Sequence, residues 1–170
     1  MSPIFTDRLL LLACPLDLAK SIILQRKNLE ERSPVTLSKD WPSSELKSIL
    51  PYYIEMLETN PNSKSLQIWL IINASKRHII GSARFRAIPH ESAVDLGYEI
   101  ISSYRNQGYG YEAVQALVDW VFLHTKTNKI TAECDCNNVG SIRLLEKIGM
   151  CCVGKEAPFL LWELNRSEIS

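Results

Sequence analysis

The sequence predicts an α/β sandwich with a single β-α-β crossover, and three observations indicate it. Residues 94–100 alternate apolar and polar side chains, which is the period of a half-buried strand. A turn with two closely spaced glycines, Gly108 and Gly110, follows that strand. The next segment has apolar residues at helical spacing, whereas most other predicted strands pair as hairpins. The predicted order is β-α-α-β-β-β-α-β-α-β-β.

The first half of the chain predicts one strand, two helical regions and one hairpin. We expect these elements at residues 4–12, 15–27, 41–59, and 65–73 with 77–87. The polar run 28–40 is a predicted loop. Pro51 lies inside the second helical region, so we expect a kink there or two short helices.

The second half predicts the crossover, one more helix and a closing hairpin. We expect helices at about 109–125 and from 138 to 148, and strands at 94–100, 129–136, 150–155 and 159–164. Asn138 suits the start of the second helix, and Gly149 suits its end. No linker or repeat interrupts the chain, which predicts one domain over residues 1–170.

Composition and charge narrow the function classes. The 170 residues are 46% hydrophobic and 22% charged, as in globular proteins. Nineteen basic residues balance nineteen acidic ones, so net charge indicates neither a nucleic-acid partner nor an anionic membrane. The first residues lack the features of a secretory leader, and no apolar stretch is long enough to span a membrane. A cytoplasmic location is therefore the expectation.

The cysteines and histidines predict no metal site. Five cysteines form an odd set without paired Cys-x-x-Cys spacing, and three histidines are scattered along the chain. We expect reduced thiols that serve no covalent catalysis, because no cysteine has a base at nucleophile spacing.

The turn at residues 105–110, called the glycine turn below, has the layout of an anion site. Glycines let backbone approach a ligand closely, and the first N–H groups of a helix lack intrahelical acceptors. Together with the helix dipole they favour a phosphate, and Arg105 adds charge at the rim. The same residues are also consistent with an ordinary loop that contains two turn glycines and a solvated arginine.

Several motifs resemble those of one known family. Arg105-x-x-Gly108-x-Gly110 resembles the acetyl-coenzyme A signature of the GNAT N-acetyltransferase superfamily. The segment from Asn138 to Met150 and Thr6-x-Arg8-Leu9 are similar to the branch that includes the bacterial ribosomal-protein alanine acetyltransferases. The resemblance is nearly full length, strong over residues 94–150 and weak over residues 13–65.

The resemblance implies a fold, a co-substrate and an acceptor class. The fold is a mixed, mostly antiparallel sheet with helices on both faces, and the co-substrate is acetyl-coenzyme A. Coenzyme contacts are implied for Ile100, Ile101, Arg105, Gln107, Gly108, Tyr109, Gly110, Tyr111, Asn138 and Ser141. The amino-terminal helices shape the acceptor side. The implied acceptor is a protein amino terminus, ribosomal or other, or a small amine, and the resemblance also allows an oligomer.

The catalytic candidates combine chemistry with the resemblance. Glu99 lies on the same predicted strand face as Gly97 and is our candidate for the base that deprotonates the amine, with Asp95 weaker. Many superfamily members carry a tyrosine acid where this chain has Leu145. The resemblance therefore assigns Ser141, with Asn138 nearby, to the leaving thiolate. Solvated or capping roles fit these residues equally well.

Two other functions remain open from the residues. Gly108-x-Gly110-x-x-Ala113 also satisfies a dinucleotide fingerprint, with Glu133 or Asp135 as ribose ligand. Only about one β-α-β unit is predicted, whereas a dinucleotide-binding oxidoreductase needs two halves. A non-catalytic module that binds or senses acyl-coenzyme A also fits, because the tyrosine is missing.

Overall fold

The computed structural model describes residues 1–24 and 35–168. Within them, nine strands form one sheet in the order β1-β2-β4-β5-β6-β7-β9-β8, with β3 added beside β5. Their bounds are β1 Ile4–Phe5, β2 Leu9–Ala13, β3 Thr36–Leu37, β4 Leu66–Asn73, β5 His78–Ala87, β6 Ala93–Ile100, β7 Lys129–Asp135, β8 Cys151–Glu156 and β9 Phe159–Asn165.

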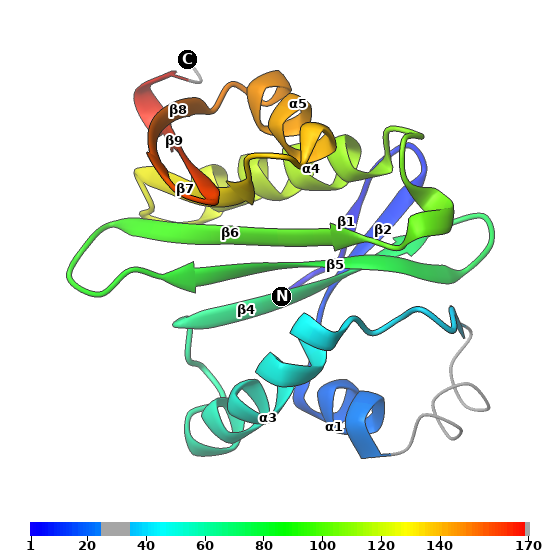
Figure 1. Ribbon diagram of the computed structural model, residues 1–170. Helices are drawn as coiled ribbons and strands as arrows, with labels where there is room; N and C mark the ends of the chain where they lie inside the picture. The colour runs from blue at the N-terminus through cyan, green and yellow to red at the C-terminus, as the bar shows by residue number, and fades with distance from the viewer. Residues whose placement is uncertain (25–34, 169–170) are drawn as a thin grey trace.

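Helices cover both faces of the sheet. Helices α1 (Leu16–Leu24) and α3 (Ser44–Thr59) lie on one face, whereas α4 (Tyr109–His124) and α5 (Val139–Lys147) lie on the other (Figure 1). The β6-α4-β7 unit makes the predicted parallel pair, and the neighbours of these strands are antiparallel. The predicted mixed, mostly antiparallel fold is confirmed.

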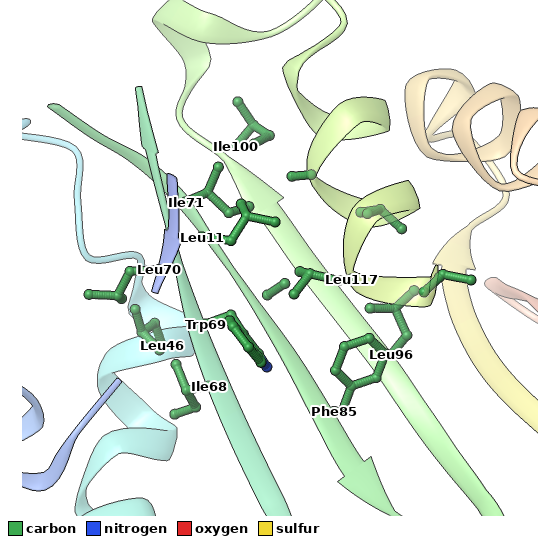
Figure 2. Close-up of a cluster of buried hydrophobic side chains, with 14 of the residues drawn as sticks. Leu11, Leu46, Ile68, Trp69, Leu70, Ile71, Phe85, Leu96, Ile100 and Leu117 are labelled. Atoms are coloured by element: carbon green, nitrogen blue, oxygen red, sulfur yellow. The ribbon is translucent and has the colours of Figure 1, made fainter. Parts of the chain in front are cut away.

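Both faces of the sheet are packed at β4, where all eight residues are buried. Figure 2 shows Ile68 and Leu70 beside Leu46 of α3, whereas Trp69 and Ile71 lie toward α4. Side chains alternate across a strand, so a central strand with helices on both sides must be apolar throughout. The sheet between α3 and α4 is therefore the rigid centre that carries the crossover.

Three predictions in the amino-terminal third are wrong or incomplete. The strand predicted over residues 4–12 is a hairpin, because the chain turns at Thr6, whose N–H bonds the carbonyl of Leu9 at 3.0 Å. The loop predicted over residues 28–40 contains strand β3 in its described part, and residues 25–34 lie outside the described residues. The helical region predicted over residues 15–27 is observed as α1 from Leu16 to Leu24, and residues 25–27 lie outside the described residues.

Pro51 neither divides α3 nor ends it. The helix runs unbroken from Ser44 to Thr59, and the Ser43 hydroxyl caps it by accepting from the N–H of Leu46 at 3.0 Å. Pro51 is exposed, so water can bond the Lys47 carbonyl that the proline leaves without a donor. Of the two predicted alternatives, the one with two short helices is therefore wrong.

The β1–β2 turn is joined to α4 through the carboxylate of Glu112. It accepts hydrogen bonds from the Thr6 hydroxyl (2.6 Å), the Arg8 backbone N–H (2.8 Å) and Arg8 Nε (2.7 Å). Burial alone would raise the pKa of Glu112, but these hydrogen bonds and the Arg8 charge lower it below its ordinary value. The ionised carboxylate therefore stabilises the folded chain.

This lowered pKa predicts a loss of stability in acid. The contribution of Glu112 is fully present above the pKa of an unfolded glutamate and is lost as pH falls through the lower folded pKa. Urea unfolding between pH 7 and pH 3 should show a shallower acid loss in Glu112→Gln than in the wild type below about pH 5. Glu58→Gln, which removes an exposed ion pair with Lys20, is the control. Equal slopes for wild type and Glu112→Gln would contradict the assignment.

Among the described residues, none of the helices has the length and apolarity to cross a membrane. The same part of the chain contains no group of three His, Cys, Asp or Glu arranged to hold a metal ion. The five cysteines are free thiols. The cytoplasmic location remains a prediction.

Candidate functional site

Strands β6 and β7 diverge before β6 ends. Their parallel pairing reaches only Leu96 opposite Ala132, whereas β6 continues to Ile100. Backbone N–H groups alternate in direction along a strand, and that of Ile101 donates to the carbonyl oxygen of Ile80 in β5 at 2.8 Å. The N–H of Ile100 therefore points to the opposite edge, where β7 has moved away.

A cleft of about 340 Å³ opens at this divergence. It is formed by the end of β6, the 3₁₀ helix η1 (Ser102–Tyr104), the glycine turn and the first turns of α4 and α5. Its lining residues are Tyr98, Glu99, Ile100, Tyr104, Arg105, Asn106, Gly108, Gly110, Tyr111, Asn138, Gly140, Ser141 and Leu144.

The glycine turn brings backbone to the wall of the cleft. Gly108 is the N-cap of α4 with φ of 82°, a conformation that side-chain residues rarely adopt. A Cβ at Gly110 would lie 3.1 Å from a methyl group of Leu144, which is tight. The first N–H groups of the 16-residue helix α4 have no intrahelical acceptor, so this end of the cleft favours an anion.

Arg105 does more than add charge at the rim. Its Nε donates to the carbonyl oxygen of Ile100 at 2.8 Å, which fixes the last residue of β6. The arginine also lines the cleft, so its charge is available there. The sequence motif indicates the charge of Arg105, but it could not indicate the hydrogen bond from this side chain to the end of β6.

Three of the expected coenzyme contacts lie beside the cleft instead of lining it. The Gln107 side chain donates to the Ser103 carbonyl (3.0 Å), and the Tyr109 ring lies under the Arg8 guanidinium, 4.2 Å from ring centre to Cζ. Ile101 lines a smaller neighbouring cavity of about 150 Å³. Their predicted contacts remain predictions.

Glu99 lies where the cleft meets this smaller cavity. Both are lined by Glu99, Ile100 and Arg105, and the smaller one opens between η1 and the segment before α3. Glu99 is half-buried, and its Oε1 accepts from the Ser82 hydroxyl at 2.9 Å. Glu99 is therefore part of the wall of both cavities.

Asp95, the weaker candidate, is engaged elsewhere. Its carboxylate accepts from Arg86 (3.4 Å) and from the Thr131 hydroxyl (3.3 Å), and it lines neither cavity. Its place on the same strand face as Glu99 does not bring it to the site.

The start of α5 forms the opposite wall. The Asn138 side chain caps the helix by accepting from the N–H of Ser141 at 3.1 Å, as its predicted capping role requires. Both residues line the cleft, and the hydroxyl of Ser141 remains available. Leu145 is fully buried, whereas Leu144 lines the cleft, so no acid group takes the place of the family's tyrosine in this helix.

Tyr98 is a cleft residue that the sequence interpretation missed. Its hydroxyl is buried and makes no well-formed hydrogen bond, although the Ser141 side chain lies next to it. Burial raises the pKa of Tyr98 more than the contact with Ser141 lowers it, so the phenol stays neutral at physiological pH. Tyr98 alternates with Glu99 along the strand, so the sequence pattern places it on the apolar face, opposite to that of Glu99.

Comparison with known proteins assigns the family. A model of the acetyltransferase (GNAT) domain matches residues 9–151. The chain belongs to the GNAT family. This GNAT protein is 32% identical over 124 residues to the uncharacterized N-acetyltransferase YjdG of Bacillus subtilis. The aligned residues cover 72% of this chain and 74% of YjdG.

Solved structures support the same GNAT fold. The ribosomal-protein-S5-alanine acetyltransferase of Vibrio fischeri has a TM-score of 0.71 at 17% identity, with 100% of both chains covered. A dodecameric spermidine N-acetyltransferase of Vibrio cholerae has a TM-score of 0.70 at 15% identity, covering 96% of this chain and 97% of that chain. The predictions of the family and of an acetyl-coenzyme A-dependent N-acetyltransferase are confirmed, and a dinucleotide oxidoreductase does not fit them.

Proposed function

We propose that residues 1–170 act as one domain that transfers an acetyl group from acetyl-coenzyme A directly to a primary amine in a ternary complex. The observation that carries this proposal is the meeting of two cavities at Glu99 and Ile100. A direct transfer needs both reactants to reach one point together, and two cavities that share these wall residues would let one reactant enter each.

The residues of the larger cleft fit the coenzyme. The glycine turn and first turn of α4 would hold the pyrophosphate, because Gly108 and Gly110 present backbone without a side chain. The free edge of β6 would pair with the pantetheine amides. When bound, acetyl-coenzyme A supplies an activated thioester. The N–H of Ile100 points to the free edge of β6, where it could stabilise the negative charge that develops on the thioester carbonyl oxygen.

Glu99 and Ser141 have separate tasks in this proposal. Glu99 takes the proton of the ammonium acceptor, directly or through water, at the junction of the cavities. Ser141 lies in the opposite wall and would donate a hydrogen bond to the sulfur that leaves as coenzyme A thiolate, while Asn138 holds the start of α5. Tyr98, beside Ser141, is a neutral donor that can orient the serine hydroxyl.

The acceptor is a protein amino terminus or a small amine, and an amine panel distinguishes these. Thiol release from acetyl-coenzyme A is measured with peptides that carry a free α-amine and with di- and polyamines. Activity with one class identifies the acceptor. Coenzyme binding without thiol release for any amine would contradict catalysis and favour an acyl-coenzyme A-binding module.

Replacing Ser141 by alanine should lower the rate modestly. A neutral hydrogen bond contributes about 0.5–1.5 kcal/mol, which corresponds to a roughly two- to tenfold lower kcat. Coenzyme affinity should hardly change, because the capping bond uses the backbone N–H of Ser141. Ser48→Ala on the exposed side of α3 is the control. An unchanged kcat would leave Ser141 as a helix-start residue only.

A further inference from the structure

The Thr6-x-Arg8 motif has no role in the chemistry above, yet Arg8 contacts the glycine turn directly. Its Nη1 donates to the carbonyl oxygen of Gln107 at 3.0 Å, and its guanidinium stacks on the ring of Tyr109. The third contact is with Glu112, through Nε at 2.7 Å. One arginine therefore holds the turn and the first turn of α4 at three positions.

The bond to Gln107 fixes the orientation of a peptide group in the turn. In a trans peptide the C=O and the following N–H point in opposite directions. Since the Gln107 carbonyl points at Arg8, the N–H of Gly108 points away from Arg8. Gly108 lines the cleft and Arg8 does not, so the arginine lies behind the turn.

Glycine makes such a restraint necessary. Gly108 has φ of 82°, and a residue without Cβ passes easily between conformations that rotate the preceding peptide. A rotated Gln107–Gly108 peptide would present a carbonyl oxygen to the cleft where an anion needs a donor. The same absence of a Cβ that lets a phosphate approach therefore leaves the turn in need of an external support.

Arg8 is itself held in place from the amino-terminal hairpin. Glu112 accepts from its Nε and its backbone N–H, and the stacked Tyr109 accepts from Asn73 Nδ2 at 3.3 Å. The Glu112 side chain is 16% exposed and that of Arg8 44%. Nε and Nη1 of the guanidinium thus bond Glu112 and Gln107, and one of its faces lies over Tyr109, which together fix its planar fork.

We propose that Arg8 is a positioning residue that holds the Gln107–Gly108 peptide with the Gly108 N–H directed to the coenzyme pyrophosphate. The inference rests on the proposed function, because it needs a coenzyme phosphate at the glycine turn. It assigns Arg8 no contact with the coenzyme. Replacing Arg8 should therefore weaken only the binding of ligands that carry a pyrophosphate.

The test compares Arg8→Met with a matched arginine variant. Arg166 also bonds backbone carbonyls, those of Phe122, Thr125 and Thr127, at the far end of α4. Arg166→Met thus removes the same chemistry away from the cleft. Coenzyme A affinity is measured by calorimetry, thermal stability by Tm, and kcat/KM with acetyl-coenzyme A and with S-acetylpantetheine, which lacks the pyrophosphate.

Arg8→Met should bind coenzyme A about tenfold to hundredfold more weakly, since it loses the support of one charged-donor hydrogen bond. Its kcat/KM with S-acetylpantetheine should match the wild type, and Arg166→Met should keep coenzyme affinity despite a lower Tm. Unchanged affinity in Arg8→Met, or equal losses with both acetyl donors, would overturn the inference.

The experiment also covers a variant that does not fold and a wild-type protein that does not bind the coenzyme. If Arg8→Met does not fold, Arg8→Lys replaces it, because one ammonium cannot bond Glu112 and Gln107 in the same fork geometry. The same two comparisons then apply. A wild-type protein that binds no acetyl-coenzyme A would overturn the proposed function, whereas normal wild-type binding with an unaffected Arg8 variant would overturn only the role of Arg8.

Discussion

Gly108→Val should abolish measurable coenzyme binding while the chain stays folded. Valine at φ of 82° is strained, and its Cβ would lie 3.2 Å from Arg8 Nη2. The turn must then shift away from the position in which its backbone can approach the coenzyme phosphates. Calorimetric titration with acetyl-coenzyme A measures the loss.

Gly149→Val is the matched control for this variant. Gly149 has φ of 89° but lies after α5, where a Cβ would meet only Leu164 at 3.9 Å. It carries similar backbone strain away from the cleft. Both variants should lose stability, and only Gly108→Val should lose the coenzyme. Wild-type affinity in Gly108→Val would remove the glycine turn from the binding site.

Glu99→Gln should lower kcat by about 10²- to 10⁴-fold and flatten the pH–rate profile, because glutamine cannot accept the proton of the amine. The amide oxygen can still accept from Ser82, so the site keeps its shape. Coenzyme affinity should therefore stay near that of the wild type. Steady-state rates across pH, with acceptor in excess, give the comparison.

Asp95→Asn is the control on the same strand. It removes a carboxylate that bonds Arg86 and Thr131 and lines neither cavity. Its kcat should change little. A wild-type pH–rate profile in Glu99→Gln would show that another group or water accepts the proton.

Local patterns sufficed for the crossover and for most of the candidate site. Alternation over β6, two glycines and a helical stripe follow one another within residues 93–124, so period and turn chemistry place them together. The cap at Asn138 and the stop at Gly149 follow from the same local rules.

Contacts between distant segments could not be read in this way. The Thr6 hydroxyl and the Glu112 carboxylate are 106 residues apart in sequence, and neither residue type indicates which distant residue it bonds. The position of Tyr98 beside Ser141 depends on how far β7 diverges from β6. The unbroken α3 depends on solvent at Pro51, which only the packed helix reveals.

Binding of acetyl-coenzyme A in the cleft between β6 and the glycine turn underlies all of these roles. It is tested by calorimetric titration of the purified chain with acetyl-coenzyme A and, separately, with NADH. We predict a saturable heat signal for acetyl-coenzyme A with a micromolar-range Kd, which corresponds to a binding free energy of about −8 kcal/mol, and no signal for NADH. No binding of acetyl-coenzyme A, or preferential binding of NADH, would contradict the account.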